Sequence, residues 1–158
     1  MKKVFFMAVL LGLFAACGSN DDDNDANKDK QKPVISDQVE VSSPIDCQVY
    51  TRGEEIPVRY LLEDNVELGN FTIEIHNNFD HHSHGTSAKE CKLDEKKAPV
   101  KPFVYKKDFT IPVGLKSYKT DINILIPADI DAGDYHFMLR LTDKIGWQEL
   151  KAVSIKIK

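Results

Sequence analysis

Several features that accompany common activities are missing from this chain of 158 residues. Its formal net charge is −4, and its lysines and arginines are not concentrated in one stretch, which argues against binding to a nucleic-acid backbone. It has no glycine-rich phosphate-binding loop and no nucleophile elbow of the kind found in hydrolases. The sequence therefore predicts a protein that is not an enzyme and does not bind nucleic acid.

Long hydrophobic stretches are also missing. The longest apolar run covers residues 4–16, which is too short for a membrane-spanning helix but suits the hydrophobic region of a signal peptide. Lys2 and Lys3 precede this run and form the basic region that such signals have. We therefore expect residues 1–16 to be an export signal.

The end of this signal, LFAAC, resembles the lipobox of bacterial lipoproteins, with Ala15 and Ala16 before Cys17. The resemblance implies that Cys17 becomes the mature N-terminus and carries several acyl chains, palmitate among them. Several chains together hold a protein stably in a lipid bilayer. The alternative is an ordinary cleaved signal followed by an unmodified cysteine.

Large apolar side chains are absent from the stretch that follows Cys17. Such a stretch cannot bury enough surface to fold, so we expect residues 17–32 to be a solvated, acidic tether before a domain of residues 33–158. The acidic run resembles signals that send some lipoproteins to the cell surface, and implies an anchor in the outer membrane with the domain outside. A plain spacer, with the domain on the periplasmic face, is the alternative. The run contains Asp21, Asp22, Asp23 and Asp25.

Cysteine is scarce, with three residues in the chain. If Cys17 carries lipid, Cys47 and Cys91 remain in an oxidising compartment, where an even number favours one disulfide. A bond across a loop of about 44 residues would stabilise the fold by roughly 4 kcal/mol. Two free thiols, or Cys91 as a soft metal ligand, are the alternatives.

Helical periodicity is absent after the tether, whereas short alternating apolar stretches recur between proline, glycine and aspartate turns. About seven such stretches predict an all-β fold, an antiparallel immunoglobulin-like β-sandwich. Near Ala152 the apolar residues of the last strand switch from one face of the strand to the other, which predicts a bulge there. The predicted strands cover residues 39–41, 56–62, 71–76, 109–111, 122–126, 135–141 and 153–157.

Two further features bear on this sandwich. The segment DAGDYHF places Tyr135 at the start of the penultimate strand, which resembles the tyrosine corner of immunoglobulin-like domains. The connection of residues 77–102 has no strong strand pattern. Loops of this length in a compact domain are usually functional or disordered.

Histidine is concentrated in one place, since four of the five lie in the segment HNNFDHHSHG. In an immunoglobulin-like sandwich the strands 71–76 and 135–141 are antiparallel neighbours, which brings His76 and His136 to the same end of one sheet. The apolar residues beside each histidine must point inward, so both histidines point outward on the same face. Imidazole is the commonest metal-ligating side chain, and the pair therefore predicts a metal site.

The segment after His76 must fold back to complete such a site, and Asp80, His82 and His84 are its candidate ligands. Nitrogen and oxygen ligands of this kind suit zinc. Copper is the alternative, because Met138 lies two residues beyond His136 on the same face and offers a thioether. The fourth histidine of the segment, His81, is either a further ligand or directed outward.

The histidine-rich segment, with the EDNVEL turn before it, resembles an uncharacterised family of bacterial lipoproteins, domain of unknown function 4625. The resemblance covers most of residues 33–158, and its distinctive part is the stretch of residues 76–84. It implies a lipoprotein of the outer envelope with a β-sandwich domain. It implies no activity.

Three functions compete on these grounds. The first is a membrane-anchored envelope lipoprotein that binds zinc or copper through its histidines. The second is a surface adhesion or assembly module that binds a protein or glycan partner through the loop of residues 77–102. The third, a metal-dependent hydrolase, ranks last because no serine or glutamate stands in a recognisable motif as nucleophile or base.

Overall fold

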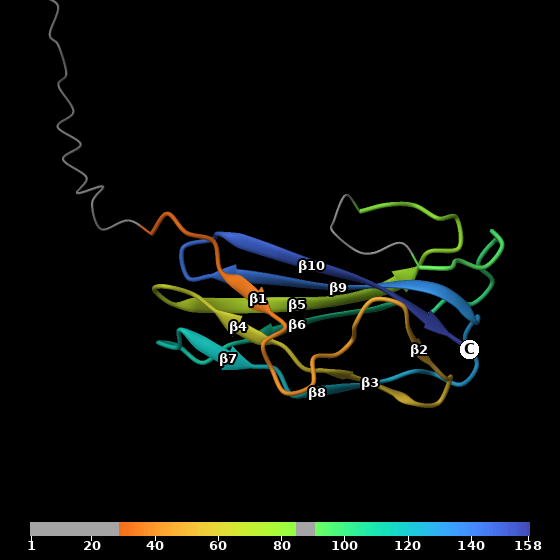
Figure 1. The fold of residues 1–158 in the computed structure, drawn as a ribbon, viewed down its shortest axis with the longest axis horizontal. Coiled ribbons are helices and arrows are strands. Elements are labelled where there is room, and N and C mark those ends of the chain that lie inside the picture. The colour runs from red at the N-terminus through yellow and green to blue at the C-terminus, as the bar shows by residue number, and fades with distance from the viewer. Residues whose placement is uncertain (1–28, 85–90) are drawn as a thin grey trace, which may run out of the picture.

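The computed structural model describes residues 29–84 and 91–158, and within these ranges the chain is all-β (Figure 1). The described residues contain no helical segment of the length and hydrophobicity that a membrane span requires. The predicted all-β fold is therefore confirmed. In chain order the strands are β1 Val34–Ser36, β2 Gln48–Tyr50, β3 Glu55–Val58, β4 Leu61–Glu63, β5 Leu68–Asn77, β6 Tyr105–Thr110, β7 Ser117–Lys119, β8 Ile122–Leu125, β9 Gly133–Asp143 and β10 Gln148–Ile157.

Five strands form the larger sheet, in the order β2-β10-β9-β5-β6. Its long central strands β10, β9 and β5 are antiparallel, and β2 runs parallel to β10 at one edge. The three central strands correspond to the last, penultimate and third predicted strands, which are also neighbours in the immunoglobulin sandwich. The predicted pairing of the third and sixth strands is confirmed.

The second layer consists of two smaller sheets, β1-β4-β7 and β3-β8, alongside the larger sheet (Figure 1). The predicted strand of residues 56–62 is split into β3 and β4 because a side chain interrupts its ladder. The Tyr60 amide donates to Oγ1 of Thr120 at 2.8 Å, and the Thr120 amide donates to the Tyr60 carbonyl at 3.0 Å. The short strands β2 and β7 were not predicted, since three residues are too few for a recognisable alternation.

The core lies between the two layers and contains the side chains whose alternation predicted it. Tyr60 of the second layer packs against Phe137 of β9, with ring centroids 6.3 Å apart. Burying a side chain of this size stabilises the fold by about 1.5–3 kcal/mol. The inward-facing residues of the two central strands are almost fully buried: Phe71, Ile73, Ile75, Tyr135, Phe137, Leu139 and Leu141.

The bulge predicted near Ala152 is wrong. The pairing of β10 with β9 is continuous from Gln148 to Ile157. The apolar residues that the bulge would have turned inward therefore stay on the outer face of the sheet, where Ala152 lies opposite Met138. The ladder is irregular elsewhere, at Gly69 near the start of β5. A Cβ atom at Gly69 would lie 2.6 Å from the carbonyl oxygen of Asp143, so glycine permits this close approach.

The strand predicted at residues 39–41 is also wrong. Val41 is 71% exposed, and the first strand of the fold is β1, a few residues earlier, which pairs antiparallel with β4. Two alternating valines are too short a pattern to distinguish a paired strand from an exposed connection.

Two predicted features, a tyrosine corner and a disulfide, link the connection between β5 and β6 to the rest of the domain. Tyr135 forms a tyrosine corner, because its hydroxyl donates to the Asp131 carbonyl at 2.5 Å and accepts from the Phe103 amide at 3.2 Å. The disulfide between Cys47 and Cys91 is confirmed, and it ties the segment before β2 to this connection.

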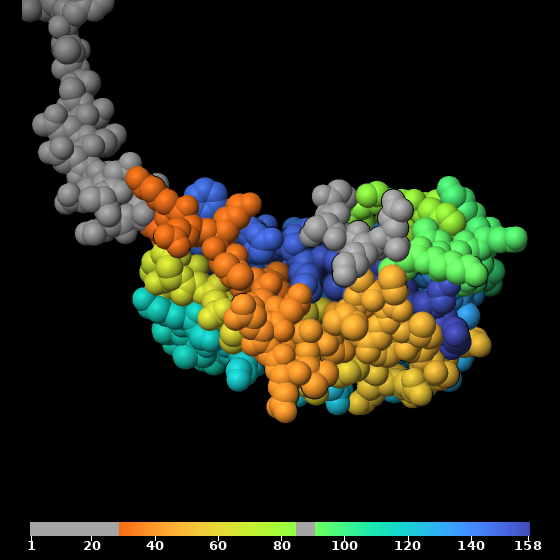
Figure 2. Space-filling view, viewed as in Figure 1, coloured from red at the N-terminus to blue at the C-terminus, as the bar shows by residue number. Residues whose placement is uncertain are grey.

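The predicted export signal of residues 1–16, the lipidation site Cys17 and the acidic run lie outside the described residues. The end of the predicted tether is described and contacts the domain. Asp29 is 9% exposed, and its carbonyl accepts a hydrogen bond from Nε1 of Trp147 at 3.2 Å. The described chain therefore joins the sandwich at the end near β1 and β7, away from the end that carries the β5–β6 connection (Figures 1 and 2).

Candidate metal centre

The framework of the candidate site is a pair of histidines on the two central strands. His76 lies near the end of β5 and His136 near the start of β9, directly opposite each other in register. Their ring centroids are 5.6 Å apart and the ring planes are nearly perpendicular, at 87°. Their placement at one end of the sheet matches the prediction. His136 is only 7% exposed, because the chain that follows β5 covers it.

The segment after β5 folds back over this pair. Phe79 is buried and packs edge-on against Tyr135, with ring centroids 5.3 Å apart. His81 adopts a left-handed backbone conformation with φ of 60°, which turns the chain sharply. These two features return His82 and His84 to the framework pair.

The four side chains His76, His82, His84 and His136 surround a common point. Nε2 of His76 lies 2.8 Å from Nε2 of His84 and 3.3 Å from Nε2 of His82. All six ring-centroid distances fall between 4.6 and 5.6 Å, and one ring nitrogen of each residue lies within 4.8 Å of the others. Ligand nitrogens of a tetrahedral zinc site are about 3.3 Å apart, given Zn–N bonds of about 2.0–2.1 Å. The group therefore has the size of a four-nitrogen metal site.

Burial favours the neutral imidazole at three of the four positions, His76, His84 and His136. Burial lowers the pKa of His136 to about 4, and the neighbouring histidines act in the same direction. Burial also lowers the pKa of His76 and His84. A neutral imidazole keeps a lone pair for a metal ion, so these residues are in the ligating form at pH 7. Nδ1 of His136 is buried without a hydrogen-bond partner among the described residues.

Carboxylates stand behind two of the four rings. Oδ1 of Asp80 accepts a hydrogen bond from Nδ1 of His82 at 2.5 Å, which directs the Nε2 atom of His82 toward His76. Oε1 of Glu74 lies 3.3 Å from Nδ1 of His76, although without hydrogen-bond geometry. Carboxylates in this position orient metal-binding histidines and raise their basicity.

The remaining candidate residues lie outside the group of four. Asp80 contacts His82 rather than the common point. His81 turns away, and its Nε2 lies 3.0 Å from the carbonyl oxygen of Asp94. Met138 is on the same outer face of β9 as His136, but its partner across β5 is Glu74. Glu74 was missed in the sequence, although its position two residues before His76 already places both side chains on one face.

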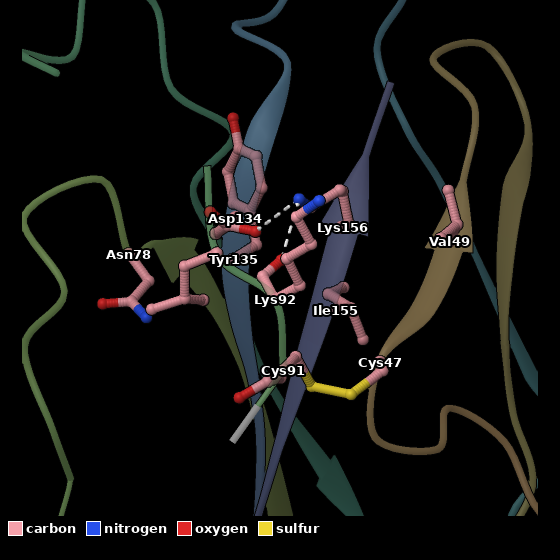
Figure 3. A pocket seen from close by; sticks show the side chains of 11 residues that line it. Cys47, Val49, Asn78, Cys91, Lys92, Asp134, Tyr135, Ile155 and Lys156 are labelled. Atoms are coloured by element: carbon pink, nitrogen blue, oxygen red, sulfur yellow. Dashed lines mark hydrogen bonds and ion pairs between the residues drawn. A yellow bond between two sulfur atoms is a disulfide. The ribbon is translucent and has the colours of Figure 1, made fainter. Parts of the chain in front are cut away.

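A cavity of about 240 Å³ lies beside the disulfide Cys47–Cys91 (Figure 3). Lys156 reaches across it, donating to the Lys92 carbonyl at 3.1 Å and pairing with Asp134 at 3.3 Å. The wall combines such polar groups with apolar side chains from β2 and β10. Sequence patterns do not reveal it, because the lining residues come from several segments that are distant in the chain.

No curated protein matches the sequence. One similar solved structure is that of Spo0M, sporulation control protein, from Bacillus subtilis, with 13% sequence identity and a TM-score of 0.40. The alignment covers 80% of this chain and 49% of that chain, so the chain spans about half the length of Spo0M. A family model matches residues 15–158, and the chain therefore belongs to the family described as Domain of unknown function (DUF4625).

Proposed function

We propose that this protein binds a transition-metal ion through His76, His82, His84 and His136. The observation that carries the proposal is the convergence of four ring nitrogens, one from each residue, to within 4.8 Å of one another. Two of these residues come from paired strands and two from a segment that folds back over them. A histidine-rich loop alone would not produce such a convergence.

Zinc is the ion that the group suits best. The four imidazole rings, with centroids at nearly equal separations, form a roughly tetrahedral arrangement, which is the geometry zinc adopts in closed protein sites. Copper(II) prefers a tetragonal arrangement, and the thioether of Met138 that would favour copper(I) is not opposite either framework histidine. Copper is therefore the second choice.

The site supports binding rather than catalysis. Catalytic zinc sites usually have three protein ligands and leave one position for water or substrate. Four histidines would complete the coordination of the ion and leave no position for a reacting group. We therefore propose capture, transfer or sensing of the metal as the role of the site, and not hydrolysis.

The metal-binding domain is proposed to be a lipoprotein of the outer envelope, anchored through acyl chains on Cys17. The lipobox-like LFAAC sequence and the acidic run support the anchor, and the disulfide fits an oxidising compartment. The described chain joins the sandwich at the end opposite the β5–β6 connection (Figure 2), and the histidines lie where that connection begins, so an anchored domain would direct the metal site away from the membrane.

The cavity beside the disulfide supports a second candidate function, binding of a protein or glycan partner through the connection of residues 77–102. Polar groups of Asp134 and Lys156 and the apolar side chain of Val49 meet in it. Binding of this kind would be insensitive to chelators, whereas metal capture would not.

Elemental analysis and calorimetry test the metal proposal. The tag-free protein should bind one zinc ion per chain, and His76→Ala/His136→Ala should lower its affinity for zinc at least a hundredfold. His81→Asn is the matched control, because it alters a histidine of the same segment outside the group and asparagine tolerates the left-handed backbone. Unchanged zinc affinity in the double variant contradicts the proposal.

A further inference from the structure

Three aspartates converge at the end of the sandwich opposite the four histidines. Asp29 precedes β1, Asp64 follows β4 and Asp143 ends β9. They are 9%, 9% and 3% exposed, and one carboxylate oxygen of each lies within 4.8 Å of the other two. Strand β5 runs about 26 Å from this end to His76, so the aspartate group is separate from the histidine group.

Each carboxylate is held by hydrogen-bond donors, and in Asp64 and Asp143 these donors contact only one of the two oxygens. Oδ1 of Asp64 accepts hydrogen bonds from the amides of residues 66 and 67, at 2.8 and 2.7 Å. Oδ1 of Asp143 accepts from the amides of residues 145, 146 and 147, between 2.6 and 3.0 Å. Oδ1 of Asp29 accepts from the Gln31 amide and from Nδ2 of Asn65, both at 3.0 Å. The side chains are therefore fixed in orientation.

The second oxygens of Asp64 and Asp143 are different. Both Oδ2 atoms are buried and have no hydrogen-bond partner among the described residues. A buried carboxylate oxygen without a partner is costly, and three carboxylates at close range also repel one another. A bound cation would remove both penalties. These unpartnered oxygens, rather than the number of aspartates, point to a ligand.

The ligand atoms of this group are carboxylate oxygens, which hard cations prefer. Ca²⁺ takes six to eight oxygen ligands at about 2.3–2.6 Å, so two of its ligands can be as much as about 5 Å apart. Mg²⁺ holds its ligands at about 2.0–2.1 Å, which limits their separation to about 4.2 Å, and it demands a nearly ideal octahedron. The aspartate oxygens lie within 4.8 Å of one another and come from three different segments, which suits the flexible coordination of Ca²⁺ better than the strict octahedron of Mg²⁺. Zinc prefers the nitrogen ligands at the opposite end.

We propose that Asp29, Asp64 and Asp143 form a calcium site that fastens the segment before β1 to the turns after β4 and β9. Calcium bound there ties the N-terminal entry of the chain to the sandwich. The Trp147 side chain reports on the site, because its Nε1 donates to the Asp29 carbonyl and its amide donates to Oδ1 of Asp143. It is the only tryptophan of the chain.

Calcium titration of the purified full-length protein, first treated with a chelator, tests the site. CaCl₂ at a hundred times its Kd should raise the melting temperature by about 5 °C or more and should change the Trp147 fluorescence in a saturable way. Mg²⁺ at the same concentration should have a smaller effect. A melting temperature and fluorescence that stay constant up to about 10 mM Ca²⁺ overturn the proposal.

Asp64→Asn and Asp143→Asn identify the ligands, because asparagine keeps the Oδ1 acceptor and removes the charge. In chelator each variant should melt at or above the temperature of the unaltered protein, since repulsion is relieved, and the shift with calcium should be lost. Asp121→Asn, on an exposed side chain, is the control that keeps the shift. A full calcium shift in Asp64→Asn overturns the assignment. His76→Ala/His136→Ala should keep the calcium response, so the two metal proposals fail independently.

Discussion

His76 and His136 are direct neighbours across the β5–β9 ladder, with ring planes 87° apart, although they are distant in the sequence. Because the central strands of the larger sheet hold both residues, half of the candidate metal site exists before any ion binds. The other half, His82 and His84, depends on the folded-back segment. This division determines which changes should weaken metal binding and which should weaken the fold.

Acid should destabilise the metal-free protein below about pH 6.5, most strongly through His136 and in the same direction through His76 and His84. The pKa of His136 is about 4 in the folded protein and about 6.5 when unfolded, so the unfolded chain binds more protons between these values. Stability should therefore be constant above about pH 7 and fall as the pH decreases from 6.5 to 4. Urea unfolding at several pH values, in the presence of a chelator, measures this change.

The control for this pH effect is His136→Ala. Its stability should depend less steeply on pH over the same window, whatever its absolute stability. Carboxylates with lowered pKa values, such as Asp94, contribute in a more acidic range, below about pH 4. An equal pH dependence in the two proteins contradicts the assignment to His136.

Asp80→Asn should weaken zinc binding without abolishing it. Asp80 orients His82 through the hydrogen bond to Nδ1, and loss of such a partner typically lowers metal affinity 10–100-fold. Competition with a zinc chelator measures the affinity, and one ion per chain should still bind. Asp108→Asn, which alters a carboxylate on β6, should leave the affinity unchanged. Complete loss of zinc would instead show that Asp80 is itself a ligand.

Removal of the disulfide should weaken the whole fold. Cys47→Ser/Cys91→Ser opens a loop of about 44 residues, and the entropy of the unfolded chain then lowers the free energy of unfolding by roughly 4 kcal/mol. Urea unfolding under non-reducing conditions measures the loss. A reducing agent should destabilise the unaltered protein and have no effect on the double variant. A loss below about 1 kcal/mol would mean that the bond constrains the unfolded chain little.

Tyr135→Phe should lower the free energy of unfolding by about 1–3 kcal/mol, because it leaves the buried Phe103 amide without its acceptor. The Asp131 carbonyl also loses a donor. Chemical denaturation measures the change. The slope of the free energy of unfolding against denaturant concentration should stay the same. Tyr105→Phe, on the edge strand β6, is the control with a smaller effect. If the two variants lose equal stability, the tyrosine corner has no special role.

Much of the fold was predictable because burial imposes a strict alternation on strands. Phe71, Ile73 and Ile75 alternate with polar residues so regularly that only one face of β5 can enter the core. Where the stretch is very short, as in β2 and β7, alternation carries no signal. At Ala152 the change of parity suggested a bulge, whereas the strand simply keeps apolar residues on its outer face.

The sequence was enough to predict the central strands of the larger sheet, the outward direction of His76 and His136, the favoured disulfide and the supply of ligating side chains near residues 80–84. Which of these side chains meet depends on the tertiary structure. It directs His81 away and places Asp80 behind His82, because the folded-back segment turns at a left-handed residue that no alternation predicts. It also brings Asp29, Asp64 and Asp143 together, since only the packing of the sandwich joins segments so far apart in the chain.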